Sequence, residues 1–460
     1  MRPHRRQFII GPVEFKNDSF FKTRRLSCGS FISYDSDLPI YTSDDDRYLL
    51  IGNAYCSKTG MGAKELVRSV RDVDVDTRTW TGRWILYFQG ELYSDLTTSL
   101  SMFYRTNCRR FWVSSSVALL AKVEEGLVRP EMVFKESNYL APTTCVSDVK
   151  QVMIGEKVNP SSGAVSWQGF SPLFTTTDDM EVIVGTLVAR FETAARAVLN
   201  SGVIVYSALT SGQDSRLDLA ALLRVSERYA FRTFTFVKSF LFMNPGDREL
   251  PKKISKKFGF HHEPIQEGEF RESVGEIYRE HCWTLRSTEP GSPFFYLQRG
   301  FWQKLPAGVL NLDHCYEIGR NTLYGKGASG VGSDFSREDL IKDGYVIDSE
   351  DYLRLDSYFA KLNDEFAIDR RDALYLYKSY PLFGKLFQAQ DLWVDSLLLG
   401  NSREMFSLLL SVRSELRSGG VFHRRLISAI NESLSDFPYN PSQPLWQKLF
   451  VRLISRMGNW

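Results

Sequence analysis

No stretch of this sequence is long and apolar enough to cross a membrane, since a spanning helix needs roughly 20 consecutive apolar residues. The basic start, MRPHRRQFII, is followed by Gly11, Pro12 and charged residues, where a signal peptide would have an apolar core. The sequence therefore predicts neither a transmembrane segment nor a secretion signal, and we expect a cytoplasmic protein.

Cysteine is also scarce. Six cysteines are spread over 460 residues, with no Cys-x-x-Cys pair and no histidine at ligand spacing. Zinc and iron–sulfur sites are therefore not expected, and reduced thiols are expected in a chain without a secretion signal. His261 and His262 are neighbours at a predicted strand start, where adjacent side chains point to opposite faces, so they give little support for a metal site.

An excess of charge of either sign is absent as well. Lysine and arginine number 57 against 55 aspartates and glutamates, which leaves a formal net charge of +2. No global field would recruit nucleic acid or an anionic membrane, so neither is an expected partner. The length of 460 residues is sufficient for two domains, each with its own core.

One stretch combines a strand, a turn and a helix in an order that suits phosphate binding. Residues 203–209 are apolar and β-branched, which is typical of a buried parallel strand. A turn of small and polar residues follows: Thr210, Ser211, Gly212, Gln213, Asp214 and Ser215. Gly212 would permit a backbone conformation that other residues resist. Residues 217–224 continue as a helix, so the turn would lie where free N–H groups and the helix dipole favour an anion. An ordinary strand-to-helix turn is the alternative for so short a motif.

This turn resembles the pyrophosphatase loop of the asparagine synthetase-like family, whose relatives include lasso-peptide cyclases and β-lactam synthetases. The family loop usually reads Ser-Gly-Gly-x-Asp-Ser, often with threonine first, and Ser211 stands where a glycine is usual. The resemblance implies that all six turn residues bind ATP, which the family cleaves between the α and β phosphates. It also implies that the end of the second strand lines the adenine pocket through backbone atoms of four residues: Phe234, Thr235, Phe236 and Val237.

The first part of the chain is predicted to be rich in β-strands. Between residues 8 and 122, short aromatic and β-branched runs are broken by glycine, aspartate and asparagine, with one helix near residues 63–73. Both faces of the run 84–88 are rather apolar, as in a strand covered on both sides of a layered sandwich. The order of segments resembles the amidohydrolase-type amino-terminal domain of asparagine synthetase relatives. We therefore predict a glutamine-amidotransferase-like domain over residues 1–165.

This domain lacks the family's nucleophile. Working members carry a cysteine directly after the initiator methionine, and its α-amine acts as the base for its own thiol. Arg2 occupies that position here. Cys28 would become amino-terminal only if everything before it were removed, and we favour a structural role as a small buried hydrophobe. The domain is thus predicted to be degenerate, without glutaminase activity.

The second part, residues 175–460, is predicted to be an α/β domain with a parallel sheet and a helical carboxyl-terminal region. The resemblance identifies it as an ATP pyrophosphatase domain of the adenine nucleotide α-hydrolase-like type. Lys378 and Lys385 lie where family members place basic groups that stabilise the transferring phosphate. We predict these two lysines, with Glu317, as catalytic residues.

An acidic segment after an apolar strand suggests a metal site. Magnesium binds through one or two carboxylates plus phosphate oxygens, and Asp214 and Glu317 would form such a pair. The resemblance implies that the segment around Glu317 is a variant of the family's glycine-rich Asp-Glu segment. The alternative is an acid at a strand end that pairs with Arg320.

These features predict an ATP-dependent, AMP-forming amide ligase that uses ATP and Mg²⁺ and adenylates a substrate carboxylate for attack by ammonia or an amine. The resemblance implies a carboxylate-bearing small molecule, sugar or peptide as substrate, and a partner amidotransferase or biosynthetic protein as one source of nitrogen. A non-catalytic ATP-binding or scaffolding relative is the alternative, favoured by Ser211 and by the altered segment before Glu317. RNA thiolation is a third reading, opposed by the balanced charge and the lack of paired cysteines.

Overall fold

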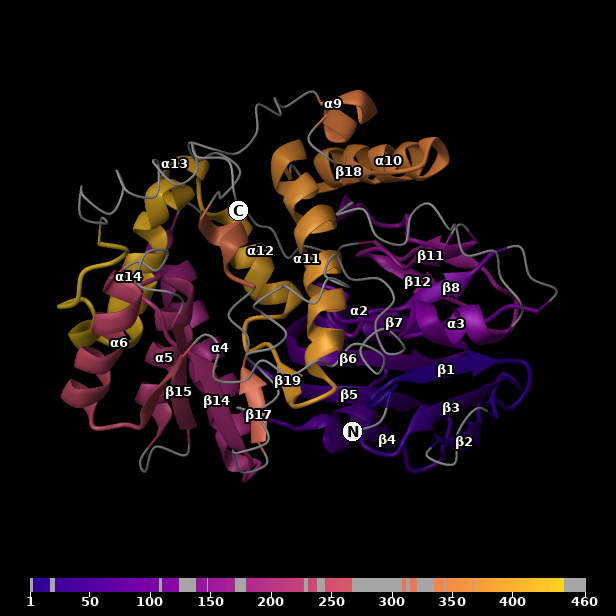
Figure 1. Ribbon diagram of the computed structural model, residues 1–460, viewed down its shortest axis with the longest axis horizontal. Coiled ribbons are helices and arrows are strands. Elements are labelled where there is room, and N and C mark those ends of the chain that lie inside the picture. Colours follow the sequence, from indigo (N-terminus) through magenta and orange to yellow (C-terminus); the bar gives the residue numbers. More distant parts are fainter. Residues whose placement is uncertain are drawn as a thin grey trace.

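The computed structural model contains two antiparallel sheets in the first part of the chain and one parallel sheet in the second, so the fold is mixed α/β (Figure 1). The structure describes residues 3–16, 21–106, 110–123, 138–146, 148–169, 179–226, 231–237, 245–266, 308–311, 315–320, 335–342, 345–366 and 368–441.

The two antiparallel sheets pack face to face through an apolar core, in which Phe8 and Ile32 of one sheet meet Ile51 and Ile85 of the other. The strands of the first sheet are, in order, β11 (Val149–Gln151), β8 (Phe103–Arg105), β9 (Val113–Ser114), β1 (Phe8–Gly11), β3 (Phe31–Asp35) and β2 (Phe21–Arg25). Those of the second are β13 (Val165–Trp167), β12 (Glu156–Val158), β7 (Glu91–Ser94), β6 (Trp80–Phe88), β5 (Leu49–Cys56) and β4 (Ile40–Thr42).

Helices cover the outer faces of this sandwich. Buried residues of the first sheet's outer face, such as Phe103, pack against Leu119 of α3, and Trp84 of the second sheet packs against Leu66 of α1. The helical segments of this part are α1 (Ala63–Ser69), α2 (Val73–Asp76), η1 (Thr77–Thr79) and α3 (Val117–Val123). Every residue of β6 is buried, as predicted for a strand covered on both sides. The closer likeness to an amidohydrolase domain stays a prediction, as do the boundaries 1–165 and 175–460.

The parallel sheet has β14 at its centre, with β15 on one side and β17 on the other. Its strands are, in order, β16 (His262–Gln266), β15 (Phe231–Val237), β14 (Ile204–Ala208), β17 (Gly308–Asn311) and β19 (Asp395–Leu397). The helices nearest to it are α4 (Met180–Asn200), α5 (Asp214–Val225) and α6 (Pro245–Phe258). Because all these strands are parallel, their carboxyl ends lie at one edge of the sheet.

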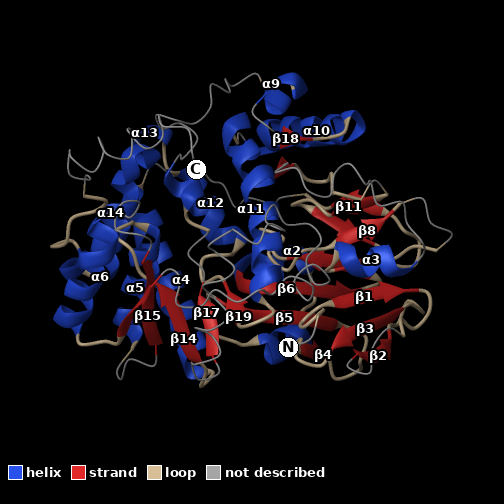
Figure 2. Ribbon diagram, in the orientation of Figure 1, coloured by secondary structure: helices blue, strands red, loops and turns tan. Residues whose placement is uncertain are grey.

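Beyond residue 335 the described chain is mostly helical, as predicted (Figure 2). Its helical segments are α9 (Arg337–Lys342), α10 (Ser349–Phe366), α11 (Arg370–Gln390), α12 (Arg403–Ser411), α13 (Ser414–Arg417), η5 (Ser418–Gly420), α14 (Val421–Ile430) and η6 (Glu432–Leu434). The short strands β10 (Asn138–Tyr139) and β18 (Tyr345–Val346) pair with each other and connect this region to the first part. A further turn, η3 (Glu317–Arg320), follows β17.

Buried polar contacts join the sandwich to the second part of the chain. Arg83 of β6 makes a bidentate ion pair with Asp391, at 2.8 and 3.0 Å, and both side chains are almost wholly buried. Nearby, Thr81 donates to the carbonyl of Leu398 at 2.7 Å. Bidentate geometry constrains orientation as well as distance, so these contacts fix the sandwich against the end of α11.

The amino-terminal strand β1 lies inside its sheet, between β3 and β9, with all four residues buried. Just before it, Arg5 donates to the carbonyl of Asp391 at 2.6 Å, and Arg6 pairs with Asp395 at 2.7 Å. Arg2 lies outside the described residues. Cutting the chain before Cys28 would remove β1, so the structure gives no support to a processed amino terminus.

Cys28 differs from the buried residue that the sequence suggested. It is half-buried, in the turn between β2 and β3, at the rim of an open cavity of about 770 Å³. Burial raises the pKa of its thiol, but hydrogen bonds from Ser161, Tyr87 and Ser30 outweigh burial and lower it. Cys28, Cys56, Cys145 and Cys315 are free thiols. Among the described residues, no helix is both long enough and apolar enough to cross a membrane.

Candidate active site

The predicted strand, turn and helix are present at the centre of the parallel sheet. Strand β14 ends at Ala208, the turn spans residues 209–213, and α5 begins at Asp214. The turn therefore lies beyond the carboxyl end of the central strand, where open α/β sheets bind their ligands. We call residues 210–215 the phosphate loop.

Two hydroxyl groups hold the phosphate loop in shape. The Ser215 Oγ accepts from the backbone N–H of Thr210 at 3.1 Å and lies 3.0 Å from the Thr210 Oγ1. Thr210 Oγ1 in turn accepts from the N–H of Gly212 at 3.0 Å. Gly212 does not adopt a positive φ, which corrects the sequence expectation. A glycine suits this position because a Cβ would come within 3.1 Å of Thr210 Oγ1.

Ser211, the residue that departs from the usual loop, is fully buried and bound to α6. Its backbone N–H donates to Asp247 Oδ1 at 2.8 Å, and its hydroxyl donates to the same oxygen at 2.6 Å. Distances this short are typical of hydrogen bonds to an ionised acceptor. The serine side chain thus has a defined partner that a glycine would not reach.

Gln213 connects the loop to the start of α14. In the amide orientation that satisfies both neighbours, its nitrogen donates to the Gly420 carbonyl at 3.2 Å and its oxygen accepts from Arg424 at 3.0 Å. Gly420 has a φ of 70°, and a Cβ there would lie 2.0 Å from the amide end of the Gln213 side chain. Position 420 therefore requires glycine both for its backbone conformation and for space.

Asp214 faces two nitrogen-bearing side chains. Its Oδ2 pairs with the Arg320 guanidinium, and its Oδ1 lies 3.7 Å from the Nε2 of His423. His423 is fully buried, and burial, assisted by the charge of Arg320, lowers the pKa of its imidazole to about 3. The histidine is therefore neutral near pH 7, and within the described part of the chain the positive charge beside this carboxylate comes from Arg320.

Glu317 begins η3, the short turn that also carries Arg320. Beside it, Tyr380 of α11 donates to the Cys315 carbonyl at 3.3 Å. Burial raises the pKa of the Tyr380 phenol well above its usual value, and the neighbouring Tyr375 and Glu317 raise it further. In this arrangement Asp214 Oδ2 pairs with the Arg320 guanidinium, whereas its Oδ1 faces the neutral imidazole of His423. The magnesium site at Asp214 and Glu317 stays a prediction.

The two predicted lysines lie on α11. The Lys378 Nζ sits 4.7 Å from the centre of the Tyr345 ring, on the side of α11 that meets β18. Within the described residues, no hydrogen bond or ion pair joins Lys378 to the phosphate loop. The side chain of Lys385 lies outside the described part of the structure. Their catalytic role also stays a prediction.

The end of β15 adjoins the loop, as a nucleotide pocket would need. The Leu209 N–H donates to the Phe234 carbonyl at 2.8 Å, and the Thr235 hydroxyl donates to the Leu209 carbonyl. Phe234 and Thr235 are buried. Of Phe236 and Val237, only the backbone is described, as the last residues of β15. Their contact with adenine remains an expectation.

A carboxyl-terminal segment that the sequence did not indicate covers the loop. We call residues 437–440 the strap. The N–H of Asn440 donates to the Ser211 carbonyl at 3.0 Å. The fully buried Arg216 donates to the carbonyls of Phe437, at 2.8 Å, and Pro438, and its guanidinium lies 4.3 Å from the centre of the Tyr439 ring. The strap and the loop thus share one set of hydrogen bonds.

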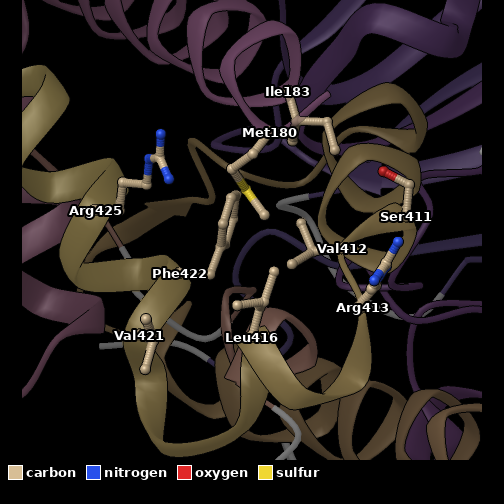
Figure 3. Close-up of a pocket in the computed structure, with 9 residues that line it drawn as sticks. All are labelled: Met180, Ile183, Ser411, Val412, Arg413, Leu416, Val421, Phe422 and Arg425. Carbon is tan, nitrogen blue, oxygen red and sulfur yellow. The ribbon is translucent and has the colours of Figure 1, made fainter. Parts of the chain in front are cut away.

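A cavity of about 290 Å³ lies beside α14 (Figure 3). Phe422, Met180 and Leu416 line it, with Arg413 and Arg425 at its sides. Arg425 pairs with Glu181. His423, the next residue after Phe422, faces Asp214 of the loop.

Sequence reasoning missed four of the residues around the loop, namely Asp247, Arg320 as the partner of Asp214, His423 and Arg216. The sequence suggests Arg320 as a partner for Glu317 instead. Asp247 and His423 are distant from the loop in sequence, and a single sequence contains no signal for such contacts. Arg216 directly follows the loop, but its contacts with residues 437 and 438 are equally distant in sequence.

Comparisons with known proteins add little to this geometry. No protein-family model and no curated protein sequence matches the chain. A U34-tRNA thiolase from Methanococcus maripaludis, solved with its 4Fe–4S cluster, is similar at 9% identity and a TM-score of 0.24, over 60% of this chain and 80% of the thiolase.

Two NAD synthetases are similar at the same level. The ammonia-dependent enzyme from Campylobacter jejuni shows 16% identity and a TM-score of 0.22, over 46% of this chain and 94% of the enzyme. The glutamine-dependent enzyme from Acinetobacter baumannii, solved with ADP, shows 14% identity and a TM-score of 0.23, over 52% of this chain and 48% of the enzyme. Similarities with TM-scores this low carry no argument about the function of this chain.

Proposed function

We propose that the chain is an ATP-dependent, AMP-forming amide ligase of the asparagine synthetase-like kind. The phosphate loop is the observation that supports this most. It joins the central parallel strand to the first turn of α5 and presents the hydroxyl groups of Thr210 and Ser215 beside that turn. First-turn N–H groups have no partner inside a helix, and they favour a bound phosphate.

The proposed reaction has two steps. A carboxylate oxygen of the substrate attacks the α-phosphorus of ATP, the bond from that phosphorus to the bridging oxygen breaks, and pyrophosphate leaves. An amine nitrogen then attacks the acyl carbon, AMP leaves with the carboxylate oxygen, and the nitrogen loses a proton. The protein's part is to position the reactants and to stabilise the developing charge.

Arg320 is the cation best placed to assist the first step. Its guanidinium already lies beside Asp214, at the first turn of α5. Magnesium, if bound by Asp214 and Glu317, would neutralise the pyrophosphate. Glu317, Lys378 and Lys385 remain proposed catalytic residues, because η3 contacts α11 and, through Arg320, pairs with Asp214 of the loop.

The source of nitrogen lies outside the first domain in this proposal. Arg2 replaces the catalytic cysteine, and the residues that follow it make ion pairs with the second part of the chain. Ammonia, an amine on the substrate, or a partner amidotransferase would supply the nitrogen. The substrate would be a carboxylate-bearing small molecule, sugar or peptide.

A non-catalytic nucleotide-binding relative is the second candidate, and one observation favours it. Three backbone N–H groups of the loop, those of Thr210, Ser211 and Gly212, already donate within the protein. A loop that only connects β14 to α5, without catalysing a reaction, would have the same hydrogen bonds.

ATP–pyrophosphate exchange separates the two candidates. The purified chain would be incubated with ATP and labelled pyrophosphate, together with a panel of aspartate, sugar acids and peptide carboxylates. Exchange that depends on one class of carboxylate supports the ligase. ATP binding without exchange for any member of the panel supports the non-catalytic relative.

A further inference from the structure

The phosphate loop already binds an anion, the carboxylate of Asp247. Two of its N–H donors are used by neighbouring hydroxyl groups, at Thr210 and Gly212. The third, on Ser211, is used by the carboxylate of Asp247, which comes from a different helix. Closely spaced loop N–H groups are the kind that bind phosphate in anion-binding turns.

The Asp247 carboxylate is held as a bound anion would be. A single oxygen accepts both the N–H of Ser211, at 2.8 Å, and its hydroxyl, at 2.6 Å. Asp247 is only partly buried, so the carboxylate can move toward solvent. The second bond exists only because position 211 is a serine.

The strap holds the other side of the same residue. The Ser211 carbonyl accepts from Asn440 at 3.0 Å and from Arg216 at 3.2 Å. Asn440 has a φ of 42°, in the left-handed region that few non-glycine residues adopt. Every hydrogen-bonding group of Ser211 is therefore engaged, between α6 on one side and the strap on the other.

We propose that Asp247 competes with phosphate for Ser211, so that the loop has a latched state, seen here, and a released state that binds nucleotide. This inference rests on the proposed function of the loop. A carboxylate and a phosphate repel each other and cannot share one pair of donors, so an incoming phosphate must displace Asp247. A ligand shifts such an equilibrium only through its stronger binding to the released state, and the latch lowers its apparent affinity.

Asp247→Asn tests the competition, since it keeps the shape of the side chain and removes the charge. The probe is inorganic pyrophosphate, titrated into the full chain by calorimetry. Pyrophosphate should bind about fivefold or more tightly to the variant than to the wild type, a change of ~1 kcal/mol. The matched control is Glu249→Gln, which removes an exposed charge on the same helix. This control should change the affinity by less than about twofold, because a rim charge that touches no donor contributes little.

A second readout needs no ligand. Hydrogen exchange of peptides covering residues 209–213 should be faster in Asp247→Asn than in wild type, and Glu249→Gln should match wild type.

Several results would overturn the latch. They are equal or weaker pyrophosphate binding by Asp247→Asn, equal tightening by Glu249→Gln, unchanged exchange at residues 209–213, or no pyrophosphate binding by any variant. Weaker binding would make Asp247 an anchor that prepares the loop for phosphate. Neither readout depends on turnover, so tightening without ATP–pyrophosphate exchange would keep the latch and reject the ligase. ATP–pyrophosphate exchange by the wild type, together with an unchanged pyrophosphate affinity in Asp247→Asn, would support the ligase and reject the latch.

Discussion

Asp214 is the residue on which the proposed chemistry depends most. It begins α5, pairs with Arg320 and lies beside the neutral imidazole of His423. A functional role for Asp214 was predicted from the resemblance of the loop alone. The ion pair between Asp214 and Arg320 was not predicted, because Arg320 lies 106 positions away in the sequence.

Asp214→Asn should reduce ATP–pyrophosphate exchange by a factor on the order of 10² or more, since the change removes the charge that positions Arg320 next to the phosphates. The melting temperature should move by only a few degrees, because the pair is partly exposed and an asparagine keeps its shape. The control is Glu192→Gln on α4, at a partly exposed carboxylate that pairs with Arg196 and Arg224. Exchange at the wild-type rate in Asp214→Asn would show that Asp214 has no part in the reaction.

His423 gives the protein a specific acid sensitivity. Burial lowers the pKa of its imidazole to about 3 in the folded state, whereas an unfolded histidine titrates near its ordinary value of 6.5. Between these values the unfolded chain binds more protons, so the free energy of unfolding falls as the pH drops below about 6.5. Burial lowers the pKa of His262 to about 4, and it acts in the same direction.

Urea unfolding at pH 7.5 and pH 5.5 measures this effect. His423 should account for a loss of about 1 kcal/mol between the two values, and His423→Asn should abolish that part of the pH dependence. His261→Asn, at an exposed neighbour of His262, should leave the part of the pH dependence that His423 contributes unchanged. A pH dependence that is the same in His423→Asn and in wild type would mean that the buried imidazole is not held neutral.

Among the elements, strand β14 and helix α5 follow directly from the sequence. An apolar β-branched run, a turn of small polar residues and an amphipathic helix are local signals, and each was predicted near its observed place, although α5 begins at Asp214, inside the predicted turn. The strap gave no such signal. Its contacts to the loop are made largely through backbone carbonyls and N–H groups, which any sequence possesses, across more than 200 positions.

The strap should depend on Arg216. Arg216→Met keeps the length of the side chain but leaves the carbonyls of Phe437 and Pro438 without their buried donor. A loss of roughly 2 kcal/mol or more in the free energy of unfolding is expected, together with faster hydrogen exchange at residues 437–441. Arg196→Met, an exposed change on α4, should do neither. Unchanged exchange at the strap would show that other contacts hold it.

At the scale of the whole molecule, the sandwich and the parallel sheet are joined by the buried pair of Arg83 and Asp391. The sequence predicted strands and layers in the first part but not this contact. A charged residue in a strand sequence does not show whether its side chain is paired. The contact fixes the sandwich to the part of the chain that carries the phosphate loop.

The purified chain should release no glutamate from glutamine. A glutaminase needs a thiolate with a base in hydrogen-bond reach, and the family obtains both from one amino-terminal cysteine that is replaced here by Arg2. Glutamate is measured by a coupled assay, with Cys28→Ala alongside. Glutamine hydrolysis that is lost in Cys28→Ala would restore a glutaminase role to the first domain.

The central claim is that a carboxylate is adenylated, and oxygen transfer tests it most directly. Once exchange has identified a substrate class, that substrate is labelled with ¹⁸O in its carboxylate and turned over with ATP and an amine. The account predicts that mass spectrometry will find one ¹⁸O atom in each AMP formed, because the acyl–phosphate oxygen leaves with AMP. Unlabelled AMP, or ADP and phosphate as the products, would contradict it.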